Sequence, residues 1–169
     1  GQGARALEFA ILTACRTGEV LNATWGEIKF ETKSWVIPAA RMKAGKEHRI
    51  PLSEPAIALL DRLEPKGLAD LIFPGQNRRK PLSNMAMLKT MHRLGVHYTP
   101  HGFRSTFRTW ISEETNHSHE VAEAALAHVI GNKVVAAYNK GDLFEKRRTL
   151  MVYWSQFVPH LEEDIEAFL

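Results

Sequence analysis

Apolar residues recur at helical spacing from the start of the chain. The first amphipathic helix is predicted to end near Cys15, and a short second helix follows Thr17-Gly18-Glu19. The apolar positions of the two helices are Ala4, Leu7, Ile11, Ala14, Val20 and Leu21.

After Gly26 the pattern changes to short β-prone runs. The runs are Glu27-Ile28-Lys29-Phe30, Ser34-Trp35-Val36-Ile37 and His48-Arg49-Ile50-Pro51-Leu52. Polar, turn-like segments separate them, Glu31-Thr32-Lys33 and Lys43-Ala44-Gly45-Lys46. This pattern predicts three short antiparallel strands.

Helical spacing returns after Ser53-Glu54-Pro55, which suits a helix start. Helices are predicted around Leu59, after a cap at Ser83 or Asn84, from Tyr98 through Arg104, from Ser118 to Leu126, and over Leu143–Val158. The positions predicted to face the core are Ala56, Leu59, Leu60 and Leu63, then Met85, Leu88, Met91 and Leu94, and finally Leu143, Leu150, Met151, Trp154, Phe157 and Val158. The fold class is therefore mainly α with a small three-stranded antiparallel β-sheet (α+β).

Composition supports a single domain. The chain has 169 residues, of which 44% are hydrophobic, enough to bury a core without a disulfide or metal. The lone Cys15 excludes a disulfide framework and a cysteine-based zinc site. Apolar runs such as Leu7–Leu12 are far shorter than the ~20 residues of a membrane helix, and no signal peptide is evident, so a cytoplasmic location is expected. The start at Gly1-Gln2-Gly3 without Met suggests a fragment of a longer protein.

Charge is distributed unevenly along the chain. The formal net charge is only +3, but residues 41–108 carry 13 basic and 5 acidic side chains, while residues 109–169 carry 5 and 10. The basic middle indicates one surface that could face a polyanion. The acidic side chains near the C-terminal end, Glu113, Glu114, Glu120 and Glu123 among them, are expected to face solvent or a neighbouring protomer.

Several donors and one hydroxyl could act together on a phosphate diester. They are Arg16, Lys43, His101, Arg104, His128 and Tyr138. Guanidinium groups grip non-bridging oxygens and stabilise the charge of a pentacoordinate transition state. A tyrosine hydroxyl, with an ordinary pKa near ~10, needs a base and positive surroundings to attack, and a lysine among cations can protonate the departing 5′ oxygen. No metal or other cofactor is required.

Four segments resemble the tyrosine recombinases of the phage integrase family, in particular integrases of prophages and genomic islands. They are Thr13-Ala14-Cys15-Arg16-Thr17-Gly18-Glu19-Val20-Leu21, Met42-Lys43-Ala44-Gly45-Lys46-Glu47-His48-Arg49-Ile50-Pro51-Leu52, His101-Gly102-Phe103-Arg104, and Leu126-Ala127-His128 with Ala137-Tyr138. They follow the family's order and spacing over almost the whole chain. Ala127 departs from the glycine that the family commonly has there.

The resemblance implies a role for each matching residue. Arg16 and Arg104 would grip the phosphate, with Glu19 supporting Arg16. Lys43 would be the general acid of a β-hairpin, and His101 would accept or position the tyrosine proton. His128 would hydrogen-bond a non-bridging oxygen. Tyr138 would form a 3′-phosphotyrosyl bond, which lets the strand be rejoined without ATP.

The resemblance also implies an assembly. Residues 1–169 would be a single catalytic domain, with core-binding and arm-binding domains lying ahead of it in the whole protein. Its substrate would be double-stranded DNA at attachment-type sites in the bacterial nucleoid. The full-length protein would form a tetramer on DNA, while the fragment would be mostly monomeric. Further DNA contacts are predicted at Lys46 and at Arg78-Arg79-Lys80.

Alternatives remain at several positions. Tyr98 and Tyr153 compete with Tyr138 as the nucleophile, but only Tyr138 follows His128 at short range. His117-Ser118-His119 with His128 is a weak metal-site pattern, and Lys146-Arg147-Arg148 is typical of a solvated face. For the whole chain, the alternatives are a type IB topoisomerase-like activity, a catalytically silent DNA-binding module of the same fold, and a metal-dependent phosphodiesterase.

Overall fold

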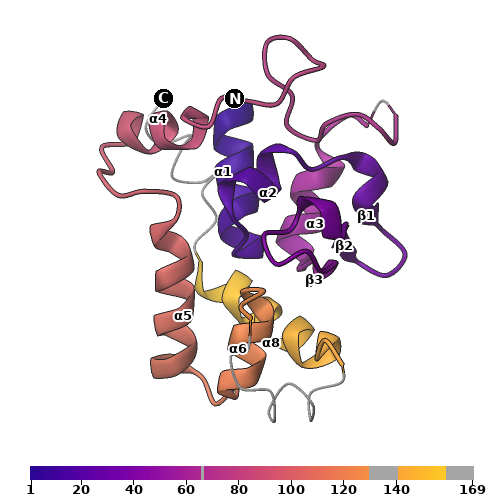
Figure 1. Ribbon diagram of the computed structural model, residues 1–169. Coiled ribbons are helices and arrows are strands. Elements are labelled where there is room, and N and C mark those ends of the chain that lie inside the picture. Colours follow the sequence, from indigo (N-terminus) through magenta and orange to yellow (C-terminus); the bar gives the residue numbers. More distant parts are fainter. Residues whose placement is uncertain (66, 130–140, 159–169) are drawn as a thin grey trace.

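The structure is a computed structural model that describes residues 1–65, 67–129 and 141–158 (Figure 1). The helices are α1 (Gln2–Thr13), α2 (Thr17–Leu21), α3 (Glu54–Asp61), α4 (Ala86–Arg93), α5 (Gly102–Glu114), α6 (His119–Ala125) and α8 (Phe144–Phe157). The strands are β1 (Ile28–Lys29), β2 (Ser34–Ile37) and β3 (His48–Pro51), and the short 3₁₀ turns are η1 (Trp25–Glu27) and η2 (Ala39–Arg41). The predicted fold class, mainly α with a small antiparallel sheet, is confirmed.

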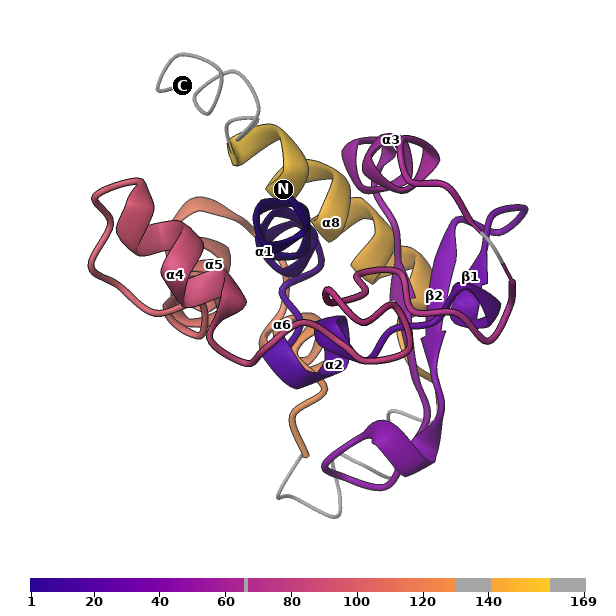
Figure 2. The ribbon, with the colours of Figure 1, turned by 90° about the horizontal axis from the view of Figure 1, so that it is seen from above.

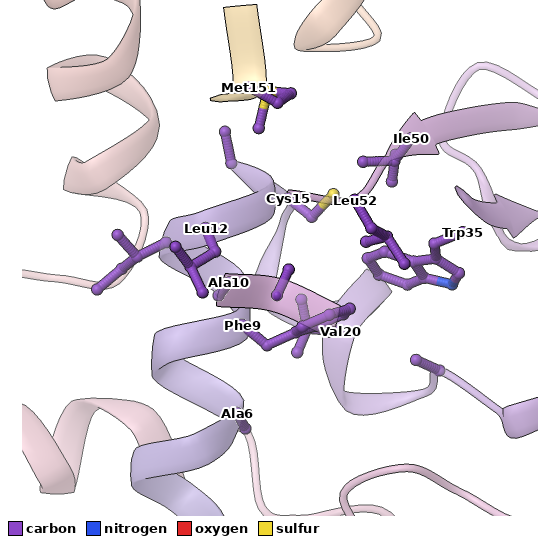
Figure 3. Packing of buried hydrophobic residues seen from close by; sticks show 14 of the residues in the cluster. Ala6, Phe9, Ala10, Leu12, Cys15, Val20, Trp35, Ile50, Leu52 and Met151 are labelled. Carbon is purple, nitrogen blue, oxygen red and sulfur yellow. The ribbon is translucent and has the colours of Figure 1, made fainter. Parts of the chain in front are cut away.

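Helix α1 is the central element of the fold. Seen from above in Figure 2, it lies between α4 and α5 on one side and α3 with the sheet on the other. Every residue from Ala6 to Thr13 is buried, so the helix is covered on more sides than an amphipathic pattern implies. Phe9 contacts Trp35 of β2 and Phe73, with ring centroids 5.2 and 5.6 Å apart, and this contact joins the helical part to the sheet (Figure 3).

The sheet has the order β1-β2-β3, with both pairs antiparallel. Trp35 pairs with Ile28 on one side and with Ile50 on the other, in the centre of the sheet. The three predicted strands are confirmed, although the first is shorter than expected. Its predicted start at Glu27 belongs to η1, because the Glu27 backbone N–H donates to the Thr24 carbonyl at 3.1 Å and closes a 3₁₀ turn there.

The methionine stripe of α4 has a different register from the one predicted. Met87 and Met91 are buried, whereas Met85 and Leu94 are 48% and 36% exposed. The buried face of α4 meets α1 at Gly3. A Cβ atom added to Gly3 would lie 2.9 Å from Oγ1 of Thr90 and 3.2 Å from the carbonyl oxygen of Ala86, both in α4. This close approach, which only glycine permits, turns the face bearing Ala86 and Thr90 toward α1.

Helix α8 returns across the core as predicted, except that Phe157, expected to face the core, is 54% exposed. Leu150, Met151 and Trp154 are buried, and Trp154 Nε1 donates to the Ile11 carbonyl of α1 at 2.7 Å. Cys15 belongs to the buried cluster that also contains Leu52 and Met151 (Figure 3), and burial raises the pKa of its thiol to about 12. Cys15 is therefore a packing residue.

In the parts of the chain described above, we find no helix with the length and apolar character needed to cross a membrane.

The reading of Lys146-Arg147-Arg148 as a solvated face is wrong for Arg147, which is 1% exposed. Its guanidinium donates to the backbone carbonyls of Arg49 in β3 and, at 3.1 Å, of Asp142. Burial lowers its pKa to about 10, so it remains a cation at neutral pH. Arg49 in turn donates to both oxygens of Asp142 and stacks on Phe144 at 3.7 Å. This cluster fastens the start of α8 to β3.

Replacing Arg147 with Ala should lower the free energy of unfolding by about 2–4 kcal/mol, since it leaves two carbonyls without their donor and opens a cavity. Arg148→Ala is the matched control: the neighbouring side chain is 30% exposed, and its loss should cost less than about 1 kcal/mol. Urea unfolding measures both. Equal effects of the two substitutions would show that Arg147 does not hold α8 to the sheet.

Candidate active site

Arg16 stands in the turn between two helices. Helix α1 ends at Ala14, whose left-handed backbone (φ 53°) reverses the chain, and Arg16 is the N-cap of α2. The buried carboxylate of Glu19 accepts from the Arg16 backbone N–H and from its Nη1, both at 2.9 Å. Glu19 thus closes the first turn of α2 and fixes the guanidinium of Arg16 at the same time.

Arg104 lies in the first turn of α5 and is only 6% exposed. It donates through Nη1 to the carbonyl of Ala14 and through Nη2 to the carbonyl of Leu126 at 2.8 Å. These carbonyls lie at the C-terminal ends of α1 and α6, where the helix dipole favours a cation. Burial lowers the pKa of Arg104 below its ordinary value.

His128 follows the end of α6 in the same way that Arg16 follows α1. Ala127 has a left-handed backbone (φ 51°), and the backbone N–H of His128 donates to the Glu123 carbonyl at 2.9 Å. The imidazole Nδ1 lies 2.7 Å from Glu123 Oε2. Partial burial alone would raise the pKa of Glu123, but hydrogen bonds from His128 and from Arg108 outweigh it and lower this pKa. The expectation that Glu123 faces solvent is therefore wrong.

Lys43 extends from the connection between β2 and β3. The tip of this connection turns at Gly45 (φ 65°), and Lys43 is exposed. Arg41, at the base of the connection, donates to Glu27 at 2.9 and 2.6 Å and to the Glu19 carbonyl at 3.1 Å. Arg41 therefore ties the connection that carries Lys43 to the helix that Arg16 caps.

Three candidate residues line one pocket. Arg16, Lys43 and His128 surround a space of about 450 Å³, together with Ala44, Glu123, Ala127 and Val129. Arg104 is bonded to the carbonyls two positions before Arg16 and two before His128. Four of the predicted residues, contributed by separate segments, are thus linked around one site with basic donors.

The other candidates are placed differently. His101 precedes α5 and is exposed, while Arg104 is buried, so the two do not share an exposed helical face as their spacing suggested. In the described part of the chain, the His101 imidazole forms no hydrogen bond or ion pair. Tyr138 lies outside the described residues. Of its competitors, Tyr98 and Tyr153 are 77% and 52% exposed, and neither lines the pocket with Arg16.

Of the basic residues predicted to contact DNA, only Lys46 adjoins this pocket. Arg78, Arg79 and Lys80 lie in a separate loop. Lys46 is exposed and lines an adjoining pocket that also contains His128. Arg78 and Arg79 line a separate pocket of about 570 Å³ with Gln2, from the start of α1, whereas Arg16 lies beyond the end of that helix. Lys80 is exposed in the same loop, where its backbone carbonyl accepts from Gly75 at 2.8 Å.

Two features of the site have no clear signal in the sequence. Glu123 was one of several acidic residues in the C-terminal third, and its partners became visible only in the fold. His48 was part of a strand motif, but it is buried and bonds to the backbone of Ala125. Its burial and the nearby charges of Arg147, Arg104 and Arg16 lower its pKa to about 3, so it is neutral and packs the strand against α6.

The weak metal-site pattern of His117-Ser118-His119 with His128 includes a histidine that lies against an arginine. His119 Nδ1 lies 2.7 Å from Arg108 Nη2, beside a cation. Within residues 1–65, 67–129 and 141–158, no three His, Cys, Asp or Glu side chains are grouped so as to hold a metal ion.

The stability of the fold should depend on pH through His48. Its pKa falls from 6.5 to about 3 on folding, so the unfolded chain binds this proton more readily. The contribution of neutral His48 is complete above about pH 6.5 and is lost as the pH falls toward 3. Urea unfolding should show wild type losing stability relative to His48→Gln, by up to about 1.4 kcal/mol per pH unit in this window. The exposed His92→Gln control should parallel wild type. Parallel curves for His48→Gln would refute the assignment.

Comparison with known proteins agrees with this arrangement. The model of the phage integrase family matches residues 3–142. Prophage integrase IntA of Escherichia coli (strain K12) is 39% identical over 154 residues, which are 89% of this chain and 37% of that protein. The integrase of Shigella phage Sf6 is 33% identical over 151 residues, covering 86% of this chain and 39% of that protein. The chain thus spans less than two fifths of the length of these relatives.

The likeness extends to a solved structure. The integrase from mycobacterium phage Brujita matches with a TM-score of 0.71 at 15% identity, over 94% of this chain and 53% of that one. At this identity the match shows a shared fold. The family match covers most of the chain and includes each segment that lines the pocket of Arg16, Lys43 and His128. The chain belongs to the phage integrase family.

Proposed function

We propose that residues 1–169 form the catalytic domain of a site-specific DNA recombinase that cuts and rejoins strands through Tyr138. The observation that carries the proposal is the pocket lined by Arg16, Lys43 and His128, two of whose segments are joined by the buried guanidinium of Arg104. A scissile phosphate bound there would meet the guanidinium of Arg16, the ammonium of Lys43 and the imidazole of His128, while Arg104 holds the segments that carry Arg16 and His128. Such a set of fixed donors suits the charge that develops when phosphorus becomes pentacoordinate.

The proposed reaction has two proton transfers, one from the attacking tyrosine and one to the departing 5′ oxygen. The Tyr138 oxygen attacks phosphorus as its proton passes to His101, and a phosphotyrosyl bond to the DNA 3′ end forms. The bond from phosphorus to the 5′ oxygen breaks, and Lys43 gives that oxygen a proton. Attack by a 5′ hydroxyl on the phosphotyrosine reverses these steps. Because the ester's energy is conserved in the covalent bond, rejoining needs no ATP, and the cationic side chains would supply the positive charge that a metal ion provides in other phosphoryl-transfer enzymes.

Arg16 would bind the phosphate with a side chain that is already held in position. Its guanidinium is fixed by Glu19 at 2.9 Å, so little side-chain entropy is lost when DNA binds. His128 would bond a non-bridging oxygen. The resemblance also implies a phosphate contact for Arg104, which in this structure is buried and bonded to the carbonyls of Ala14 and Leu126. These roles are the ones that the family resemblance implies for the matching positions.

The partner in this proposal is double-stranded DNA at attachment-type sites. Lys46 adjoins the pocket and would contact neighbouring phosphates, and Arg78, Arg79 and Lys80 would extend the contact near the start of α1. The full-length protein would act as a tetramer on DNA, in the bacterial nucleoid, while the chain alone would be a weakly binding monomer. The relatives described above are named integrases, which favours recombination over topoisomerase-like relaxation.

Changing Tyr138 to Phe should abolish the covalent adduct with a nicked suicide substrate and leave DNA affinity unchanged, because only the nucleophilic oxygen is removed. Tyr153→Phe, which changes an exposed tyrosine outside the pocket, should form the adduct at the wild-type rate. Adducts are counted on denaturing gels, with this chain and with the longest natural protein that contains it. An adduct that survives in Tyr138→Phe, or none in either wild-type protein, would disprove the catalytic assignment.

Chelation separates this proposal from a metal-dependent phosphodiesterase. Adduct formation and rejoining should proceed at the same rate in EDTA as in Mg²⁺, since the arginines and lysine supply the positive charge. The measurement is single-turnover cleavage of the suicide substrate after dialysis against EDTA. A rate that falls with EDTA and returns with a divalent cation would identify a metal enzyme.

The topoisomerase alternative has its own test. Relaxation of supercoiled DNA without strand transfer would favour it.

A further inference from the structure

His128 is partly exposed at the pocket, yet it is bound at two points. Its side chain is 42% exposed. Its backbone N–H bonds to the Glu123 carbonyl at 2.9 Å, and its Nδ1 contacts Glu123 Oε2 at 2.7 Å. One residue therefore fixes both the backbone and the ring of a group that the proposed function places against the phosphate.

We infer that Glu123 is a positioning residue that aims the imidazole of His128 at the scissile phosphate, an inference that rests on the proposed function. A carboxylate can only accept a hydrogen bond from the ring, so Nδ1 carries a proton in this contact. Nδ1 is then occupied, and Nε2 is the ring nitrogen left to face the phosphate. A neutral ring protonated at Nδ1 can only accept at Nε2, so donation to a non-bridging oxygen would require the doubly protonated ring, whose charge Glu123 would balance.

Glu123 is itself held from a second helix. Arg108 of α5 donates through Nε to Glu123 Oε1 at 3.1 Å, leaving Oε2 for His128. Arg108 is kept in place by Ser112 Oγ at 2.6 Å and by the His119 ring at 2.7 Å. The side chains of Arg108 and Glu123 are 28% and 19% exposed, so the chain of contacts is partly shielded from water.

This network gives α5 two connections to the site. Arg104, one turn before Arg108, bonds to the end of α6 at Leu126, and Arg108 reaches His128 through Glu123. Displacing α5 would therefore shift the loop and the imidazole together. The alternative is that Glu123 only ties α6 to α5, in which case its loss would weaken the fold without acting through His128.

A double-mutant cycle distinguishes the two roles. Single-turnover cleavage of a nicked suicide substrate at saturating protein is compared for wild type, Glu123→Ala, His128→Ala and the double variant. We expect Glu123→Ala to slow cleavage about 10-fold or more with unchanged DNA affinity, and to cause no further loss when His128 is already Ala. Glu123→Gln, which keeps an acceptor oxygen, should recover part of the rate. Glu120→Ala, one turn earlier on α6, should cleave like wild type.

Two outcomes of the mutant cycle would overturn the inference. One is an equal slowing by Glu123→Ala with and without His128, and the other is an unchanged cleavage rate in Glu123→Ala. ¹⁵N NMR of the histidine rings tests the contact without catalysis. In this chain, the Nδ1–H of His128 should be observed in wild type and lost in Glu123→Ala, and a signal that persists in the variant also rejects the inference. If wild type forms no adduct, the proposed function fails, while the NMR result still decides whether Glu123 orients the ring.

Discussion

Two helices of this protein end against the same buried guanidinium. Arg104 donates to the carbonyl of the left-handed Ala14 after α1 and to the carbonyl of Leu126, which precedes the left-handed Ala127 after α6. A left-handed alanine costs about 1–2 kcal/mol, and charge-assisted hydrogen bonds of about 1.5–3 kcal/mol each offset it. The reversals bring Arg16 and His128 toward the same pocket. Without the cation between the helix ends, neither the turns nor the pocket would be fixed in place.

Three carboxylates hold the groups around this pocket. Glu19 fixes Arg16, Glu123 contacts His128, and Glu27 binds Arg41 at the base of the connection that carries Lys43. Each carboxylate also receives a second donor, so its position does not depend on one flexible side chain: the Arg16 backbone for Glu19, Arg108 for Glu123, and Trp35 Nε1 at 2.8 Å for Glu27. The acidic residues of the region thus position cations, and the basic donors remain at the pocket surface for an anionic ligand.

Burial decides which cations can serve an external ligand. Arg104 and Arg147 are almost inaccessible and donate their hydrogen bonds to backbone carbonyls. Lys43 is exposed, and Arg16 is partly exposed. His48 shows the other response to burial: with arginines nearby, it is neutral and packs as an uncharged side chain. The site therefore consists of a buried layer that sets the geometry and an outer layer with free donors. The family's recombination chemistry, as proposed here, would take place at the outer layer.

The sequence by itself determined the order and type of the elements, the three-stranded sheet, and the set formed by Arg16, Lys43, Arg104 and His128, because these depend on local periodicity, turn residues and motif spacing. Only the tertiary structure decided which face of α4 is buried, that Arg147 is internal, and that His101 and Arg104 differ in exposure. These outcomes depend on the close approach at Gly3 and on carbonyls far away in the chain, such as Arg49 for Arg147. Glu123 shows the same limit: its spacing from His128 is local, but its orientation requires Arg108 on another helix, and no pattern along one segment encodes that contact.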